Sequence, residues 1–93
     1  MLVSVVVGLL NEEKFLPRLI EDFKNQTYPH NKIELIFIDG MSKDTSWQIL
    51  EDFKQSNHDF YNVVLLKNPK VILSAGMNVG IKAANGECIL KVD

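Results

Sequence analysis

The chain has 93 residues, of which 46% are hydrophobic and 24% are charged, and its formal net charge is −2. This length and composition fit one small soluble domain with an apolar core. The ten Lys and Arg residues are spread along the chain, which excludes the basic stripe of a nucleic-acid-binding protein, and a single cysteine excludes disulfides and cysteine-based zinc sites.

Membrane and secretion signals are missing from the sequence. No apolar run approaches the roughly 20 residues that span a bilayer. The first seven residues lack the basic leader of a signal peptide. We therefore expect a cytoplasmic protein, which reaches the membrane only through parts outside these 93 residues.

The first predicted elements are a strand, a helix and a second strand. Residues 2–8 are apolar on both faces, as in the middle of a parallel sheet. A helix is predicted over 16–25, with Pro17 in its first turn, where a missing N–H costs nothing. Its apolar face is formed by residues at helical spacing: Phe15, Leu16, Leu19, Ile20 and Phe23. The run IELIFID at 33–39 predicts the second strand.

The second half repeats the same alternation. Residues 42–45 can cap a helix that runs to about residue 55 with Trp47, Leu50 and Phe53 on its apolar face. A third strand is predicted at 62–67, a third helix starts at Ser74, and Asn85-Gly86 ends it with a left-handed residue. That helix carries Met77, Ile81 and Ala84 inward. A fourth strand is predicted at 88–92.

This β-α-β-α-β-α-β order predicts an α/β fold, an open parallel sheet with helices on both faces. The expected strand order is 3-2-1-4, with the first strand interior. We see one domain, residues 1–93, without repeats or linkers. Because it stops at the end of a strand, we expect it to be a portion of a longer protein.

Polar residues follow three of the predicted strands: residues 11–13, Asp39 and Asp93. Carboxylates gathered at the carboxyl edge of a sheet suit Mg²⁺ or Mn²⁺, or hydrogen bonds to a base and ribose. For Glu12 and Glu13 the alternative is a helix start, and Asp44 favours a helix cap. His30 and His58 are interpreted as solvated turn residues.

Other nucleotide motifs are missing. No Gly-Lys-Ser or Gly-Lys-Thr occurs, and the glycine at position 8 is not followed by the further glycines of a dinucleotide fingerprint. ATPase and nicotinamide-dependent functions are therefore excluded.

Four motifs occur together and in order: N-E-E at 11–13, I-D-G-x-S-x-D at 38–44, N-x-G-I-x-A-A-x-G-E at 78–87, and V-D at 92–93. In order and spacing they resemble the amino-terminal half of family 2 glycosyltransferases of the GT-A fold, closest to the succinoglycan-type exopolysaccharide branch. The resemblance covers essentially the whole chain. The joint occurrence of the motifs is much more specific than any one of them.

The resemblance implies an inverting glycosyltransferase of polysaccharide biosynthesis, which moves a sugar from a nucleoside diphosphate donor, a UDP-sugar, to a glycan or lipid-linked acceptor. The implied nucleotide-binding residues are Gly8, Leu9, Leu10, Asn11, Glu12, Asp39 and Met77. Asp93 matches the first aspartate of the D-x-D motif, which holds Mn²⁺ or Mg²⁺. The general base lies beyond Asp93, so the 93 residues hold no catalytic residue and alone are expected to be inactive.

The sequence departs from the family pattern at several of these positions. The family often has Pro-Thr-Tyr at 8–10, a second acidic residue at Gly40 and an arginine at Met77, which leaves the nucleotide and the sugar open. Two alternatives come from other classes. One is a receiver-type signalling module, although its phospho-accepting aspartate is replaced by Lys67 and Asn68. The other is an interaction protein that keeps the fold without the chemistry.

Overall fold

The structure, a computed structural model, describes residues 1–57, 59–68, 85, 86 and 88–92. Its strands are β1 (Val3–Leu9), β2 (Ile33–Asp39), β3 (Asn62–Lys67) and β4 (Cys88–Val92). The helices are α1 (Leu16–Lys24), α2 (Ser46–Ser56) and a short 3₁₀ helix, η1 (His30–Lys32). These bounds confirm the predicted elements to within one residue, and α2 starts directly after the residues predicted to cap it. The third helix predicted from Ser74 lies outside the described residues.

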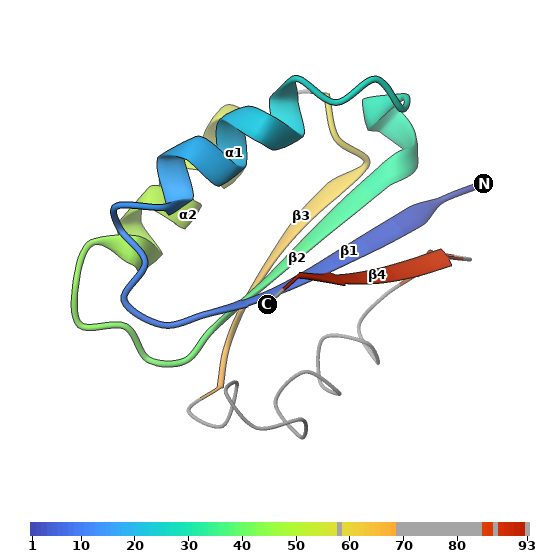
Figure 1. Ribbon diagram of the computed structural model, residues 1–93. Helices are drawn as coiled ribbons and strands as arrows, with labels where there is room; N and C mark the ends of the chain where they lie inside the picture. Colours follow the sequence, from blue (N-terminus) through green and yellow to red (C-terminus); the bar gives the residue numbers. More distant parts are fainter. Residues whose placement is uncertain (58, 69–84, 87, 93) are drawn as a thin grey trace.

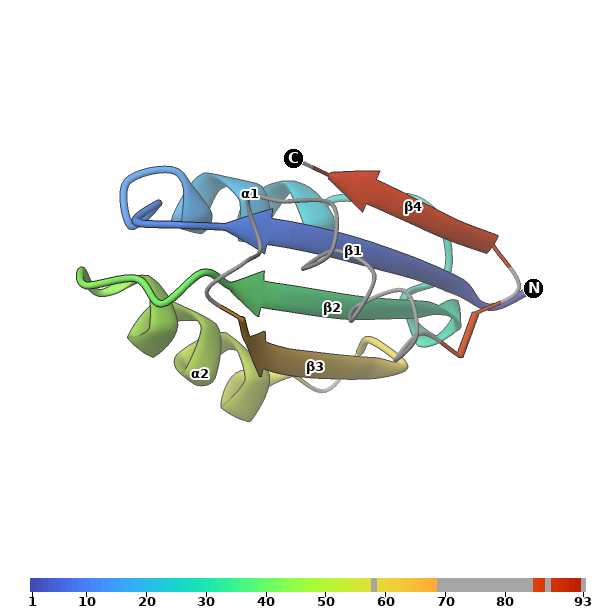
Figure 2. The ribbon, with the colours of Figure 1, turned by 90° about the horizontal axis from the view of Figure 1, so that it is seen from below.

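The four strands form one parallel sheet in the order β3-β2-β1-β4 (Figure 2). Both the order and the parallel direction were predicted, and β1 lies in the interior. The register pairs Leu9 of β1 with Asp39 of β2, and Val7 with Val92 of β4. Because all strands run the same way, their carboxyl ends meet at one edge of the sheet.

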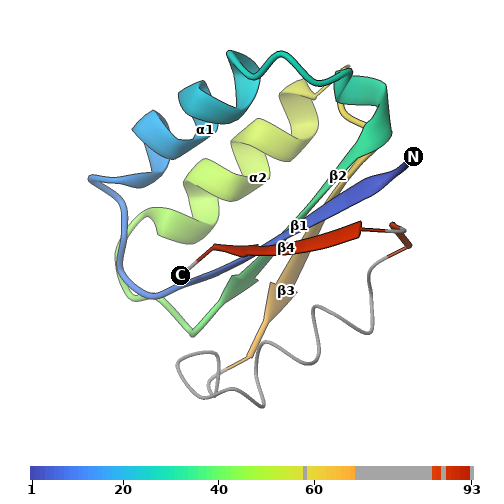
Figure 3. The ribbon, with the colours of Figure 1, turned by 45° about the vertical axis from the view of Figure 1, so that its right-hand side comes forward.

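Both described helices cover the same face of the sheet (Figures 1 and 3). None of the helices in the described part of the chain is long and apolar enough to cross a lipid bilayer. Pro17 lies in the first turn of α1, as predicted. Helices were predicted on both faces of the sheet, and this is confirmed for the face covered by α1 and α2. The helix expected on the opposite face, from Ser74 on, lies outside the described residues.

The larger core lies between the helices and the sheet. Its centre is Phe37, which is fully buried and makes edge-on ring contacts with Phe23 and Phe53 at centroid distances of 6.2 Å. The buried members are Val5, Val7, Leu9, Leu16, Ile20, Ile33, Leu35, Phe37, Leu50, Phe53, Phe60 and Val63. A second apolar cluster, Val6, Ile36 and Ile38 with Val64 and Leu66, lies on the opposite face. β1, β2 and β3 are therefore apolar on both faces.

The turn before β4 differs from the sequence prediction. Among the described residues only Asn11 and Met41 have positive φ, so Asn85-Gly86 does not supply a left-handed residue. Gly86 is needed for a different reason. A Cβ atom at this position would touch Ser4 Oγ and would stand 2.6 Å from the Ser4 backbone nitrogen and 3.0 Å from the Leu2 carbonyl oxygen.

Replacing Gly86 by Ala should therefore destabilise the protein. Because one of the crowded atoms belongs to the backbone of β1, relief requires a shift of the strand, and overpacking of this kind costs about 1–3 kcal/mol. Urea denaturation measures the loss, with the exposed Lys32→Ala in η1 as the control. A Gly86→Ala variant as stable as the control would contradict this close approach.

Candidate functional site

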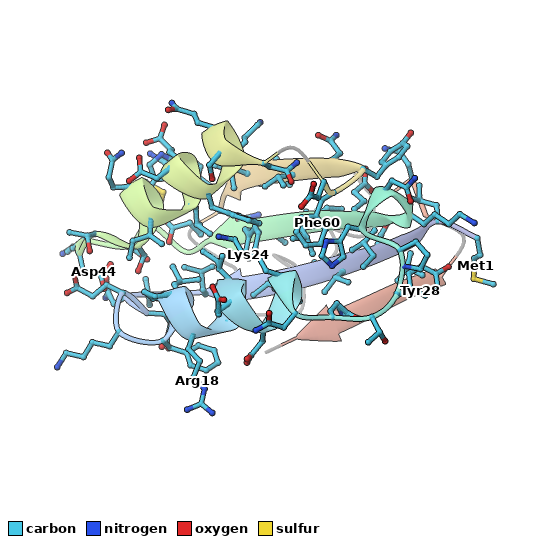
Figure 4. All side chains as sticks on the ribbon, turned by 90° about the horizontal axis from the view of Figure 1, so that it is seen from above. Met1, Arg18, Lys24, Tyr28, Asp44 and Phe60 are labelled. Carbon is cyan, nitrogen blue, oxygen red and sulfur yellow. The ribbon has the colours of Figure 1, made fainter. Side chains whose placement is uncertain are left out.

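The candidate site lies at the carboxyl edge of the sheet, where two loops follow neighbouring strands. The first loop, residues 10–15, follows β1, and the second loop, residues 40–45, follows β2. Asp44 of the second loop marks this end of the molecule, and Met1 and Tyr28 mark the opposite end (Figure 4). The pairing of Leu9 with Asp39 brings the starts of the two loops side by side.

Asp39 shapes the second loop from a buried position. Only 1% of its surface is exposed, and its carboxylate accepts hydrogen bonds from the Ser42 backbone N–H (3.1 Å) and from the Ser42 hydroxyl. Its backbone carbonyl accepts from the N–H of Asn68 at 2.9 Å, and the N–H of Gly40 donates to the Leu9 carbonyl at 2.8 Å. The acidic turn is thus tied to both neighbouring strands.

The hydroxyl of Ser42 joins the two loops. It donates to Asp39 and accepts a hydrogen bond from the backbone N–H of Asn11 at 2.8 Å. The Asn11 side-chain oxygen in turn accepts from the N–H of Lys43 at 2.8 Å. Asn11 has φ 52° and Met41 has φ 70°, both in the left-handed region. Asn adopts this region more readily than most residues, whereas a Met backbone in this region is strained.

A second set of hydrogen bonds joins the loops further along. The buried Ser46 accepts from the N–H of Glu12 at 2.9 Å, and the Asp44 carboxylate accepts from the N–H of Glu13 at 3.2 Å. Asp44 also accepts from the N–H of Ser46 at 2.9 Å, but the N-cap residue of α2 is Thr45, so Asp44 supports the helix start from the position before the cap. The Thr45 hydroxyl donates to the Glu13 carboxylate at 2.6 Å.

The structure places six of the eight sequence-predicted site residues. Asn11 and Glu12 are exposed, Gly8 and Leu10 are half-buried, and Leu9 and Asp39 are buried in the same edge. Met77 and Asp93 lie outside the described residues, so the structure does not test their proposed convergence with the others. The nucleotide-binding and metal-binding roles stay predictions.

Two sequence interpretations need correction. Glu12 and Glu13 do not begin a helix, because α1 starts at Leu16 and has no acidic residue in its first turn. His30 is not a solvated turn residue. It is half-buried in η1, and its ring stacks on Phe60 at a centroid distance of 4.6 Å. It lies away from the candidate site, as expected, and His58 is outside the described residues.

Sequence reasoning missed Ser42 and Ser46 as the residues that join the loops. Their partners are 31 to 34 positions away in the chain, so no local pattern shows the contact. The available signal was the I-D-G-x-S-x-D motif, which contains Ser42 between two acidic residues.

A cleft of about 210 Å³ opens beside β1 on the α1 side. Its lining is apolar apart from Glu12 and consists of Val7, Gly8, Leu9, Glu12, Phe15, Leu16 and Leu19. Three predicted site residues, Gly8, Leu9 and Glu12, therefore border an accessible space. Phe15, which is 48% exposed, forms part of its wall.

The described residues alone do not build a cation site. Within the described ranges, no three His, Cys, Asp or Glu side chains gather where they could hold a metal ion. The carboxylates of Glu13 and Asp44 already accept hydrogen bonds that join the loops. Asp93 is the remaining candidate from the sequence.

Asp44 has an altered ionisation. Burial by itself would raise the pKa of its carboxyl, but the hydrogen bonds from Ser46 and from the backbone N–H of Glu13 outweigh this and lower the pKa below its ordinary value of 3.8. These hydrogen bonds therefore favour the ionised form of the Asp44 carboxyl.

The sequence matches a known family over nearly its whole length. The family described as glycosyl transferase family 2 matches residues 4–93. A dolichyl N-acetyl-glucosaminyl phosphate diacetamido-dideoxy-glucuronosyltransferase from Methanococcus voltae is 33% identical over 91% of this chain. A poly(ribitol-phosphate) beta-glucosyltransferase from Bacillus spizizenii is 34% identical over 100% of it. The chain spans 26% and 14% of the lengths of these relatives.

Solved structures share the fold. Staphylococcus aureus TarS in complex with UDP-GlcNAc superimposes with a TM-score of 0.82 at 28% identity, over 100% of this chain and 26% of that one. The mannosyltransferase PcManGT from Pyrobaculum calidifontis, in complex with GDP-Man and Mn²⁺, gives a TM-score of 0.84 at 22% identity over 94% of this chain and 25% of its own. At that identity the second likeness shows the fold alone.

The lowered pKa of Asp44 predicts a pH dependence of stability. Because the pKa is lower in the folded chain than in the unfolded one, the ionised carboxylate stabilises the fold above pH 3.8, and this contribution is lost as the pH falls through the lowered pKa. Urea denaturation of the protein and of Asp44→Asn should show a difference at neutral pH that shrinks in acid. A difference that stays constant down to the lowest pH, or an equal effect of Asp22→Asn on the exposed face of α1, would contradict this role.

Proposed function

The chain belongs to glycosyltransferase family 2, and from this we propose that it forms the nucleotide-sugar-binding part of an inverting, metal-dependent glycosyltransferase. The donor is a nucleoside diphosphate sugar, and UDP is the favoured nucleotide because TarS, which matches along the whole chain, was solved with UDP-GlcNAc. The acceptor is a glycan or a lipid-linked glycan of polysaccharide biosynthesis, which fits the lipid-linked acceptor in the name of the Methanococcus voltae relative. The enzyme works in the cytoplasm or at the cytoplasmic face of the membrane.

The observation that carries this proposal is the joining of the two loops at the carboxyl edge. Ligands of open α/β sheets bind in the crevice outside the carboxyl ends of the strands. Here the N–H groups of Asn11, Glu12 and Glu13 are already held by the second loop and by Ser46. A loop held in place loses less conformational entropy when a ligand binds, and this raises affinity.

Each predicted binding residue that the structure describes has a part in this proposal that its position allows. Residues 8–12 border the base and ribose, with aliphatic contact from Leu9 and Leu10 replacing an aromatic stack. Asp39 positions the second loop through Ser42, and a carboxylate has further lone pairs that can accept from a base or a ribose hydroxyl. Asp93 and Met77 complete the set, Asp93 as an anchor for Mn²⁺ or Mg²⁺.

The chemistry divides between this chain and the sequence that follows it. A bound divalent cation stabilises the negative charge that develops on the leaving diphosphate. The residues of this chain bind and orient the donor. A carboxylate beyond residue 93 removes the proton of the acceptor hydroxyl, which attacks the sugar from the face opposite the diphosphate, and the configuration inverts.

A receiver-type module is disfavoured by the structure as well as by the family. The third strand ends at Lys67, and the residue after it, Asn68, is used in a backbone hydrogen bond to Asp39. Neither side chain can accept a phosphoryl group as an aspartate does.

Nucleotide binding by the full-length protein tests the proposal. We expect isothermal titration to show UDP binding that is tighter with Mn²⁺ than without it, and Asp39→Ala to weaken it by at least roughly tenfold, which corresponds to about 1.4 kcal/mol. Asp22→Ala, an exposed acid on α1, is the control and should bind as the unaltered protein does. No binding of any nucleoside diphosphate would refute the proposal.

Sugar transfer is the second readout. The full-length protein should release UDP from a UDP-sugar only with Mn²⁺ or Mg²⁺, Asp93→Ala should abolish this release, and residues 1–93 alone should transfer no sugar. Full activity of Asp93→Ala, or transfer without a metal, would remove the metal from the mechanism.

A further inference from the structure

A buried carboxylate lies at the amino end of the sheet, on the opposite edge from the candidate site. Glu34 of β2 and Ser4 of β1 are both fully buried, and they are paired across the two strands. The Ser4 hydroxyl donates to Glu34 Oε1 at 2.9 Å. The backbone N–H of Asn85 donates to Oε1 at 2.9 Å, and its side-chain amide donates to Oε2 at 3.0 Å.

Gly86 completes the arrangement. Its backbone N–H donates to Ser4 Oγ at 2.8 Å, so the Ser4 hydroxyl accepts one hydrogen bond and gives one. We call Ser4, Glu34, Asn85 and Gly86 the Glu34 network. No buried side-chain oxygen or nitrogen in the described part of the chain lacks a partner. A fully satisfied buried carboxylate is costly to disturb, because loss of a partner leaves a desolvated polar group unpaired.

The network connects three segments that are far apart in the sequence. Its bonds join residues 30, 51 and 82 positions apart, and it ends on the two residues of the turn that leads to β4. Ser4 also pairs with Ile89 of β4. Gly86 packs so closely on Ser4 that even a Cβ atom would collide with the Ser4 backbone. The start of β4 is therefore fixed relative to β1.

We propose that Glu34 is a positioning residue that sets the register of β4 on β1. A slip by one residue would turn every side chain of the strand to the other face of the sheet. In the observed register β4 ends with Val92 beside Val7, the residue before Gly8. The inference rests on the proposed function in one respect: the residue after Val92 is the proposed metal anchor, Asp93, and its place depends on this register.

The chemistry of the network distinguishes two substitutions of Glu34. Gln keeps an oxygen for Ser4 and for the Asn85 N–H, and its NH₂ group can donate to the Asn85 side chain once that amide turns over. Met has a similar length but cannot accept these hydrogen bonds. Gln should therefore preserve the register, and Met should not. Ser4→Ala is a milder variant, which removes only the bond from Gly86 and the bond to Glu34.

Hydrogen exchange of the full-length protein tests how firmly the Glu34 network holds β4 on β1. In Glu34→Met and Ser4→Ala, backbone amides of residues 88–92 should exchange about 10–100-fold faster, whereas those of residues 33–39 should change less. Glu34→Gln should stay close to the unaltered protein. Ile36→Val, which removes one buried methyl group from the same strand, is the matched control. Equal acceleration of both segments, or none, would overturn the proposal.

UDP titration in the presence of Mn²⁺ links the register to binding. Glu34→Met and Ser4→Ala should weaken UDP binding on the order of tenfold, which is typical when a residue that orients a metal ligand from outside the site is lost. Glu34→Gln and Ile36→Val should leave UDP binding unchanged. Faster exchange of β4 with unchanged UDP affinity would overturn the positioning role while leaving the proposed function intact. If the unaltered protein binds no nucleotide, the proposed function fails, and the exchange result still decides whether Glu34 holds β4 on β1.

Discussion

The hydroxyl of Ser42 is the contact on which the candidate site depends. It accepts a hydrogen bond from the backbone N–H of Asn11 in the first loop and donates one to the buried carboxylate of Asp39. The contact is possible only because the parallel register places Leu9 beside Asp39, so that both loops leave the sheet at the same level. The hydrogen bonds of Ser42 thus hold together two loops that strand pairing brings side by side.

The two ends of the sheet share this design. At the carboxyl end a serine hydroxyl joins a buried aspartate to a backbone N–H, and at the amino end Ser4 joins the buried Glu34 to the N–H of Gly86. Glu34 bonds directly to a segment distant in the sequence, whereas Asp39 holds the loop that follows it and reaches the first loop through Ser42. β2 is buried along its whole length, which excludes water from both carboxylates and strengthens their hydrogen bonds.

Much of the fold was predictable from the sequence because each strand is a short apolar run and each described helix has a clear apolar face. The parallel order followed from these elements and the family resemblance, and the comparisons confirmed the family. The cross-loop contacts of Ser42 and Ser46 were not predictable, because hydrogen bonds over 30 positions leave no periodic pattern. The role of Gly86 was mistaken for the same reason: a glycine can allow positive φ or close approach, and only the packing on Ser4 distinguishes them.

The central claim is that the joined loops at the carboxyl edge bind a nucleoside diphosphate. Hydrogen exchange of the full-length protein with and without saturating UDP and Mn²⁺ tests it most directly. The account predicts slower exchange in residues 8–12 and 39–46 and no change in η1 at the opposite end of the sheet. Protection of η1 with no change in the two loops would contradict it.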